Sequence, residues 1–379
     1  MELKPGYKQT EVGVIPEDWE VELLPSVVDR SNGKAHEQFV VDHGRYVVVN
    51  SKFISSDGRV RKYTNKSYCL AKKDSILMVM SDLPSGKALA KCFLVDTDDR
   101  YAVNQRVCSF KAKKDLPAYL FYVLNRNAYF LKFDDGVQQT HLLNDVFNCC
   151  PIILPPRVEE QRAIAEALGD ADALISCLEK LIAKKRDLKQ AAMQELLSGR
   201  TRLPGFHEAW KTKLLGDVLK VRHGKGQRGI VVPDGKYPIL ATGGEIGRTD
   251  QFLYDKPSVL IGRKGTIDAP QYVDTPFWTI DTLFYTEIST EADARFIFYK
   301  FNTIPWRSYN EASGVPSLNA STIEGIKFTC PHPKEQAAIA EVISDMDAEI
   351  ATLERRIAKT RDLKQGMMQE LLTGRTRLV

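Results

Sequence analysis

The sequence lacks the cysteine pairs, the long apolar runs and the charge excess that mark several large classes of protein. Its seven cysteines include no C-x-x-C pair, and such a scattered, odd set is typical of reduced thiols rather than of a disulfide framework. No stretch approaches about 18 apolar residues, so no membrane span is expected. The first 19 residues contain no apolar core of a signal peptide. We therefore expect a cytoplasmic protein without a membrane anchor.

Catalytic motifs are also missing. The chain has no Asn-Pro-Pro-aromatic motif of an amino-methyltransferase and no G-x-x-x-x-G-K-[ST] phosphate loop. Its six histidines show no metal-ligand spacing. The stretch Pro233-Asp234-Gly235-Lys236 is superficially similar to the Asp-x-Lys part of a nuclease motif, but Pro-Asp-Gly is typical of a turn. The sequence therefore predicts no catalytic residue, no metal and no cofactor in this chain.

A duplicated segment is the strongest feature that is present. Residues 160–203 and 335–378 are identical at 30 of 44 positions, including the phrases RDLKQ, MQELL and GRTRL. Chance would give roughly two or three identities, so the segment is an internal repeat. The chain of 379 residues is also long enough for two or more domains.

Each copy of the repeat predicts one long helix. Prolines precede both copies, glycine follows at Gly199 or Gly374, and about 38 residues between them contain no proline. Apolar residues recur four and three apart, which is the pattern of a coiled-coil seam. The predicted seam residues are Ile164, Leu168, Ile175, Leu178, Ile182, Ile339, Ile343, Ile350, Leu353 and Ile357, and the stripe then continues through Leu188, Ala192, Leu196, Leu363, Met367 and Leu371.

A narrow apolar stripe on a long helix needs another helix, and the other copy is the economical partner. We therefore expect the two helices to pair antiparallel within the chain. The alternative is that each helix packs only on its own domain.

The segments before and between the helices predict mixed α/β modules. Runs such as YVVVN and SVLIG, punctuated by glycine, are typical of short strands. Helices are expected over 116–131 and 292–302. The two modules are weakly alike, since EDWEVELL at 17–24 resembles EAWKTKLL at 208–215. The predicted α+β architecture has a first module at 1–155, a central helix at 156–200, a second module at 201–330 and a C-terminal helix at 331–379, with pseudo-twofold repetition.

At this point the chain resembles the specificity subunits of Type I restriction–modification systems. The resemblance rests on the two Pro-to-Glu-Gln helix starts, at 156–161 and 331–336, and on the two L-L-[ST]-G helix ends. It rests further on the Trp-initiated modules and on the glycine-rich core at 241–270. The first module departs from the pattern, because it has MVMSDLPSGKALA where the second has LIGRKGTID.

The resemblance implies a function in host defence and a set of partners. Two target recognition domains, at 19–155 and 210–330, would read an asymmetric two-part target in double-stranded DNA. The helices would separate them and dock two methyltransferase subunits, with restriction subunits in the larger complex. S-adenosylmethionine, ATP and magnesium would belong to those partners, and DNA methylation would occur on adenine.

Candidate DNA contacts are cations and amides on glycine-rich turns, which can reach phosphates and base edges. Each has an ordinary solvated turn as its alternative. In the first module these are Arg59, Arg61, Lys62 and Lys66 around Tyr63, Lys87 in a turn with Ser85 and Gly86, and the amide-rich tip Gln138, Gln139 and Thr140. In the second module they are Arg222, Lys225 and Arg228, then Arg248, then Arg263, Lys264 and Thr266 in GRKGT.

The repeated helix also carries a cation run, KKRDLKQ at 184–190, for which both a partner surface and a solvated face are open. The favoured hypothesis is a non-catalytic DNA-reading subunit. The alternatives are an adaptor that holds two protein-binding modules on a coiled coil, and a nuclease that acts alone.

Overall fold

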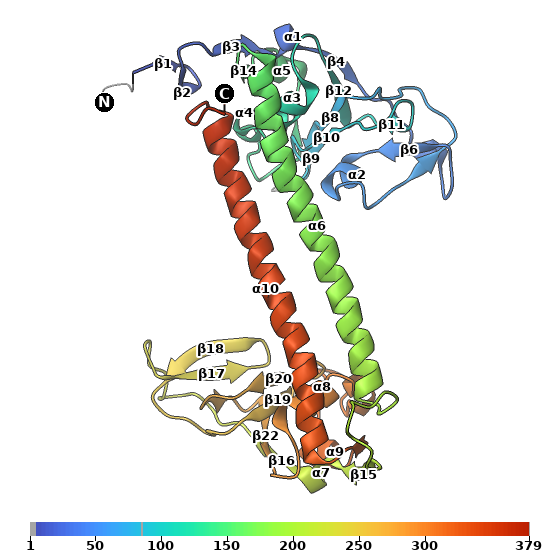
Figure 1. Cartoon of the computed structure of the whole chain (residues 1–379), viewed down its shortest axis with the longest axis vertical. Helices are drawn as coiled ribbons and strands as arrows, with labels where there is room; N and C mark the ends of the chain where they lie inside the picture. The colour runs from blue at the N-terminus through green and yellow to red at the C-terminus, as the bar shows by residue number, and fades with distance from the viewer. Residues whose placement is uncertain (1–4, 85, 379) are drawn as a thin grey trace. The chain divides into compact units, whose positions relative to one another are not determined.

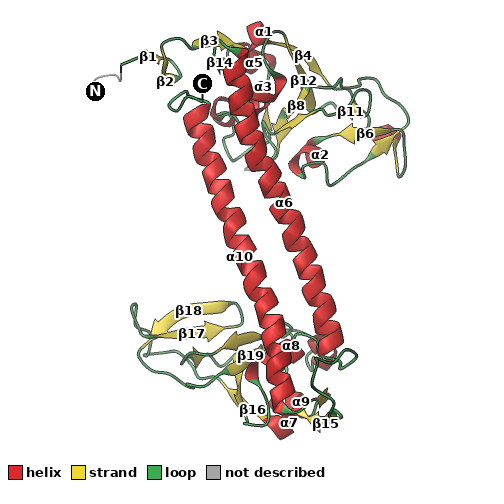
Figure 2. Ribbon diagram, in the orientation of Figure 1, coloured by secondary structure: helices red, strands yellow, loops and turns green. Residues whose placement is uncertain are grey.

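The computed structural model describes residues 5–84 and 86–378, which form two compact units. The first unit comprises Met1–Cys177 with Ile357–Val379, and the second comprises Leu178–Arg356. Each unit contains one module and part of each long helix, which are labelled α6 and α10 in Figures 1 and 2. The module boundaries predicted from sequence lie near the helix ends, whereas the boundary between the compact units falls within the helices.

Helices α6 (Val158–Leu196) and α10 (Pro333–Leu371) have 39 residues each. Both are followed by a glycine of positive φ, 72° at Gly199 and 69° at Gly374. Glycine adopts this left-handed conformation without the steric penalty of a Cβ atom, so it ends the helix cleanly. The two predicted long helices are confirmed.

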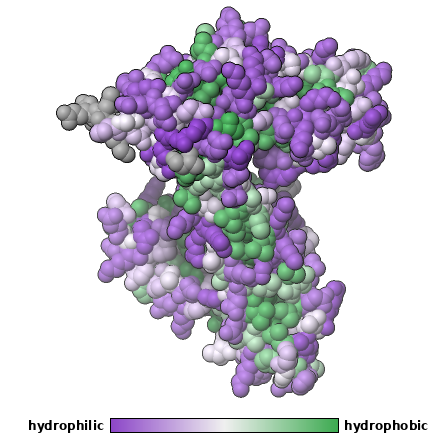
Figure 3. All heavy atoms as spheres, turned by 45° about the horizontal axis from the view of Figure 1, so that its top comes forward, coloured by the Kyte–Doolittle hydropathy of each residue, from purple (hydrophilic) through white to green (hydrophobic). Residues whose placement is uncertain are grey.

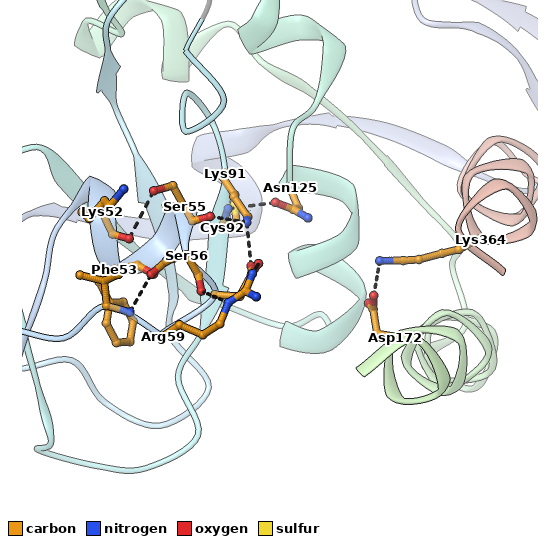
Figure 4. A network of polar contacts seen from close by, with 12 residues as sticks. Lys52, Phe53, Ser55, Ser56, Arg59, Lys91, Cys92, Asn125, Asp172 and Lys364 are labelled. Atoms are coloured by element: carbon orange, nitrogen blue, oxygen red, sulfur yellow. Dashed lines mark hydrogen bonds and ion pairs between the residues drawn. The ribbon is translucent and has the colours of Figure 1, made fainter. Parts of the chain in front are cut away.

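Within each unit the two helices run antiparallel. In the first unit, Asp172 in the first half of α6 accepts a hydrogen bond of 2.6 Å from Nζ of Lys364 in the second half of α10 (Figure 4). In the second unit, Nζ of Lys185 in the second half of α6 donates to Glu349 in the first half of α10 at 2.8 Å. The predicted antiparallel pair is therefore present in both units.

The apolar stripe has two different roles along each helix. Ile164 and Leu168 belong to the core of the first module, and Ile339 and Ile343 to the core of the second. The remaining predicted seam residues lie farther along the helices: Leu178, Ile182, Ile350 and Ile357 are buried, and Ile175 and Leu353 are half-buried. The start of each helix therefore packs on its own module, and the two helices also pair with each other.

The predicted continuation of the stripe is wrong at two positions. Leu188 is 47% exposed and Leu363 is 63% exposed. The residue that follows each one points across the pair instead, because Lys189 binds Asp347 and Lys364 binds Asp172. The side of the helix that meets its partner at this level is therefore polar.

The Glu-Gln pair at each helix start joins the helix to its module. Buried Gln161 accepts a hydrogen bond from the amide of Leu116 at 2.9 Å and donates to the carbonyl of Pro155 at 3.1 Å. Gln336 repeats the arrangement with the amide of Asp293 and the carbonyl of Pro331. The glutamine therefore fixes the angle at which each module meets its helix.

The preceding glutamates form two clasps, each with an arginine from the other copy of the repeat. Arg202 contacts Glu335 in the second unit, and Arg377 contacts Glu160 in the first. Arg377 also donates to both oxygens of Asp18, at 2.9 and 3.0 Å. Since Glu160 and Glu335 are almost completely buried, each needs its arginine to balance the charge.

The first module is built around two four-stranded sheets, of order β10-β8-β12-β4 and β11-β6-β7-β5. The pair β11–β6 is parallel, and the other pairs of these sheets are antiparallel. Smaller pairs are β1-β2, β13-β9 and β14-β3. The elements are β1 (Tyr7–Thr10), β2 (Gly13–Pro16), β3 (Glu20–Leu23), α1 (Leu24–Val27), β4 (Val28–Asn32), η1 (Glu37–Phe39), β5 (Val40–Val41), β6 (Tyr46–Val49), α2 (Ser51–Ser55), β7 (Tyr63–Thr64), β8 (Ile76–Val79), β9 (Ser81–Asp82), β10 (Cys92–Leu94), β11 (Tyr101–Val103), β12 (Val107–Ala112), α3 (Pro117–Leu124), α4 (Ala128–Leu131), β13 (Thr140–His141), α5 (Asn144–Asn148) and β14 (Pro151–Leu154).

The second module has the same plan with sheets β16-β22-β19-β20, β18-β17-β21 and β15-β23. Here β17–β21 is the parallel pair. The elements are β15 (Lys211–Leu214), α7 (Leu215–Val218), β16 (Leu219–His223), β17 (Tyr237–Ala241), β18 (Gly244–Thr249), β19 (Ser258–Gly262), β20 (Gln271–Val273), β21 (Trp278–Thr279), β22 (Leu283–Ile288), α8 (Ala294–Phe301), η2 (Trp306–Tyr309), α9 (Ala320–Glu324) and β23 (Lys327–Cys330). The predicted α+β repeat is confirmed.

The helix predicted over 116–131 is two helices, because the chain breaks at Asn125–Asn127. Arg126 has a φ of 58°, which a right-handed helix does not allow, and the Asn127 side chain caps α4. The helix predicted over 292–302 is confirmed as α8, with Asp293 as its cap. Among the described residues, no helix has the length and apolar character needed to cross a membrane.

Candidate nucleic-acid interface

The segment 279–282 brings two predicted loops of the second module together. The amide of Lys225 donates to the carbonyl of Thr279 at 2.8 Å, and the amide of Arg263 donates to the carbonyl of Thr282 at 2.8 Å. The GRKGT turn follows β19 directly, and its Gly265 has a φ of 87°. Lys225, Arg228, Lys264 and Thr266 are all exposed, and Arg263 is half-buried. The backbones of Lys225 and Arg263 are therefore held by one segment, and both loops carry exposed cations.

Two other predicted contacts of this module have partners within the chain. Arg222 lies in strand β16 rather than in the predicted loop, and it forms a 2.9 Å ion pair with Glu287. Its hydrogen bond to Glu287 raises the pKa of the guanidinium above its ordinary value. Arg248 donates to the carbonyls of Gly235 and Lys236 and to Glu245. Both arginines hold the module together, and their DNA contact stays a prediction.

The Pro-Asp-Gly-Lys stretch lies in the exposed connection that precedes β17, with Pro233 and Asp234 in a turn. Gly235 packs so closely on the backbone of Thr249 that a Cβ atom would lie 2.4 Å from its nitrogen. Across the described ranges, no cluster of three or more histidine, cysteine or acidic side chains could hold a metal ion. The stretch is a structural turn.

The predicted basic cluster of the first module lies between α2 and the residues after β7. Arg59, Arg61, Lys62 and Lys66 are exposed. Nε of Arg59 donates to the carbonyl of Ser56 at 3.0 Å (Figure 4), and Nε of Arg61 donates to the carbonyl of Gly58 at 2.9 Å. An outer nitrogen of Arg59 also lies 3.9 Å from the Asp57 carboxylate, so this exposed arginine already has partners within the chain.

The amide-rich tip of the first module is paired with the turn that corresponds to GRKGT. Strand β13, which starts at Thr140, pairs with β9, and Nε2 of Gln139 donates to Oγ of Ser81 at 2.9 Å. Thr140 is buried, whereas Gln138 and Lys87 are exposed. Ser85, the remaining residue of the predicted turn, lies outside the described residues. The tip and the turn are thus neighbours, as are the equivalent segments of the second module, where Lys264 bridges to Ser317.

Most cations of the KKRDLKQ run are paired within the second unit. Lys185 binds Glu349, Arg186 binds Glu354 and Lys189 binds Asp347. The run therefore stabilises the helix pair. This role differs from both sequence interpretations, which were a partner surface and a solvated face. Its role as a partner surface stays a prediction.

Sequence reasoning missed a second duplication, which lies inside the modules. The stretch GKAHEQFVVDHGRY at 33–46 and the stretch GKGQRGIVVPDGKY at 224–237 share Gly, Lys, Val-Val, Gly and Tyr without a gap. Each follows the strand that begins its module's main sheet, β4 or β16. A direct comparison of the two modules would have found Lys34 as the counterpart of Lys225.

The surface of the first module is mainly hydrophilic on the face that Figure 3 turns toward the viewer. Interfaces with DNA are more polar and more positively charged than interfaces between proteins. The described cations on exposed loops therefore suit a polyanion better than an apolar partner.

Comparison with known proteins agrees with this geometry. The family model described as the Type I restriction modification DNA specificity domain matches residues 16–185 and 207–360. The MjaVIII specificity subunit of a Type I restriction enzyme from Methanocaldococcus jannaschii is 24% identical, over 96% of this chain and 94% of that protein. The crystal structure of a Type I restriction–modification S subunit from M. genitalium has the same fold, with a TM-score of 0.68 at 16% identity over 98% of both chains.

Proposed function

The chain belongs to the Type I restriction modification DNA specificity family, and from this we propose that its two modules read the two halves of one asymmetric DNA target. The family membership supports a DNA specificity subunit and not the alternative of a non-DNA adaptor. The observation that carries the two-part target is internal: one fold occurs twice in the chain with different side chains on equivalent loops. Two modules that share one fold but have different surface side chains would recognise two different half-sites.

The loops around 279–282 and the equivalent loops of the first module form the proposed reading surface. Exposed cations on these loops would neutralise phosphates, and side chains at the turns would reach base edges. The paired helices would set the spacer between the half-sites.

Catalysis would come from partner proteins. Two methyltransferase subunits would dock on the two copies of the repeat, and restriction subunits would join through them. S-adenosylmethionine, ATP and magnesium would bind to those partners and not to this chain. We place the complex in the cytoplasm, where it meets DNA.

Co-expression with the cognate methyltransferase, followed by single-molecule mapping of methylated adenines, tests the proposal. We expect a two-part motif with a fixed spacer and different half-sites. A methylation pattern without such a motif would contradict the two-part reading.

A salt titration of DNA binding by the same complex tests the electrostatic part. The affinity should fall steeply with rising salt, because each neutralised phosphate releases counterions. An affinity that does not depend on salt would favour the adaptor. Metal-dependent cleavage by the chain alone would favour the nuclease.

A further inference from the structure

The two Gly-Lys loops, residues 33–39 and 224–230, have the same place in the two modules. Each leaves the main sheet and passes the end of the parallel strand of the second sheet, β11 or β21. A Cβ atom on Gly33 would lie 2.1 Å from the carbonyl oxygen of Asn104, and one on Gly224 would lie 2.0 Å from that of Ile280. Both glycines are therefore needed for this close backbone approach.

The lysine that follows is fixed by its backbone in both modules. The amide of Lys34 donates to Val103 at 3.0 Å, just as the amide of Lys225 donates to Thr279. The carbonyl of Lys34 lies 2.6 Å from Nδ1 of His36, and the carbonyl of Lys225 accepts a 2.9 Å bond from Nε1 of Trp278. In each module the ring N–H of an aromatic residue thus binds the carbonyl of the lysine. This residue is His36 in the first module and Trp278 in the second.

His36 can make its contact only as a donor. It is completely buried, and its Nε2 accepts a hydrogen bond from the amide of Tyr68 at 3.2 Å. Nδ1 therefore carries the proton that is donated to Lys34. Both lysine side chains are exposed and form no ion pair among the residues that the structure describes.

Three positions after the lysine the loops carry opposite charges. Glu37 is exposed, and its two oxygens accept hydrogen bonds from the side chain of Asn104 and from the amide of His36. Its carboxylate lines an open pocket of about 470 Å³ together with Gln105 and Arg106. The equivalent residue, Arg228, is exposed in a turn and has no ion pair within the described ranges.

We propose that the Gly-Lys loops are matched DNA-reading elements, in which Lys34 and Lys225 bind backbone phosphates and Glu37 and Arg228 read different bases. The inference rests on the proposed function and adds residues to it. Its logic is that phosphate contacts carry no sequence information, so two modules with different half-sites can share them. Contacts to base edges have to differ between the modules. The loops show this division, with one identical cation and one residue of reversed charge.

The chemistry of the variable position assigns the kind of base. A carboxylate accepts a hydrogen bond from the amino group of cytosine, whereas an arginine donates two to guanine. Asn104 and the backbone hold the Glu37 carboxylate in one orientation, which limits the entropy lost on binding. Each of its oxygens keeps a further lone pair for a base.

The lysine arm of the test uses the complex with the methyltransferase and a duplex that carries the mapped motif. A plot of log affinity against log salt has a negative slope. Lys34→Ala and Lys225→Ala should each make this slope less negative by about 0.9, because one phosphate contact is lost. They should weaken binding to matching and non-matching duplexes by the same factor. Lys114→Ala, at an exposed lysine near the start of α3, is the matched control and should leave the slope unchanged. Unchanged slopes in both loop variants would overturn the phosphate role.

The base-reading arm maps methylation by the Glu37→Gln and Glu37→Arg variants. Glu37→Gln should lose about tenfold or more of the discrimination at one position of one half-site. Glu37→Arg should change the preference there to guanine, while the other half-site and the spacer stay the same. Glu11→Gln, in the β1–β2 turn of the same module, is the control. A normal motif in both Glu37 variants, with the complex still assembled, would overturn the reading role.

The two levels of the proposal fail differently. If the wild-type complex shows no two-part motif, the proposed function fails and the loop assignment fails with it. If the wild-type complex has the motif and the loop variants do not change it, only the loop assignment fails.

Discussion

Arg202 holds the buried carboxylate of Glu335 through two hydrogen bonds, 2.6 Å from Nε and 2.7 Å from Nη2. The two residues are 133 positions apart and come from different copies of the repeat. The guanidinium also lies 5.7 Å from the ring centre of Trp210. Arg377, Glu160 and Trp19 repeat this arrangement in the first unit. The conspicuous repetition of GRTRL is thereby explained, because its last arginine closes a clasp.

Breaking the clasp should destabilise the unit that contains it. Arg202→Ala leaves the Glu335 carboxylate buried without a counter-charge, which should lower the free energy of unfolding by clearly more than the loss of an exposed arginine does. Urea unfolding followed by circular dichroism measures the loss. Arg200→Ala removes an exposed arginine two residues away and should change the free energy by less than about 0.5 kcal/mol. Equal effects of the two variants would show that the clasp contributes little.

The two glycines after the helices should respond differently to alanine. Both have positive φ, so alanine at either position should destabilise by about 1–2 kcal/mol. At Gly374 the new Cβ would also lie 2.5 Å from Cγ of Pro16, whereas at Gly199 the nearest atom is 3.2 Å away, in Trp210. Thermal unfolding should therefore show the larger loss for Gly374→Ala. The reverse order would contradict the close packing at Pro16.

Thiol chemistry should separate the cysteines by burial. Burial raises the pKa of Cys108 and of Cys150 to about 12, whereas Cys149 and Cys177 are exposed. Thiolate is the reactive form, and a raised pKa means that little thiolate exists at pH 8. At pH 8, iodoacetamide should therefore modify the exposed Cys149 and Cys177 and spare Cys108 and Cys150. Peptide mass spectrometry, with Cys149→Ser to resolve the adjacent pair, gives the readout; rapid labelling of Cys150 in native protein would disagree with its burial.

We expect that the long helices can be shortened with both clasps intact only when the same number of residues is removed from each. In each copy of the repeat, the clasp glutamate and the clasp arginine are 42 positions apart, since 202 − 160 and 377 − 335 are both 42. Deleting residues 178–184 together with 353–359 removes one heptad from each helix and keeps both clasps. Each helix shortens by about 10 Å, so the spacer in the methylated motif should shrink by about three base pairs with unchanged half-sites.

Deletion of 178–184 alone is the informative counterpart. It leaves 35 positions in one copy of the repeat against 42 in the other, so one clasp has to break. We expect lower stability and a smaller yield of assembled complex than for the matched deletion. Altered half-site bases with an unchanged spacer, in the matched variant, would contradict the role of the helices.

The sequence predicted the long helices because the signals are local and strong. Prolines, glycines and the heptad pattern act within a few residues, and duplication showed them twice. The break at Arg126 was not predictable in this way, because LPAYLFYVLNRNAYFL has good helical residues on both sides and only the tertiary fold imposes the positive φ. Leu188 and Leu363 were misassigned for a related reason: apolar spacing does not reveal that an aspartate of the other helix and its lysine occupy the facing position.

The candidate contacts show a similar division. Charged residues on glycine-rich turns were placed correctly on exposed loops at Lys225, Lys264 and Arg59. Arg222 and Arg248 could not be separated from them, because their partners are a side chain on a neighbouring strand and carbonyls of a distant turn. Glu37 carried no cationic signal at all, and only its equivalence to Arg228 draws attention to it.

The first unit includes residues 357–379, from the far end of the sequence, whereas the second unit is one continuous stretch. A ribosome therefore produces everything that the second unit needs before it produces Arg377. Until then, the first module keeps Trp19 and the Glu160 carboxylate without their final neighbours, and contacts of such long sequence separation form slowly. We therefore expect the second unit to complete its folding first, although the ribosome synthesises the first module earlier.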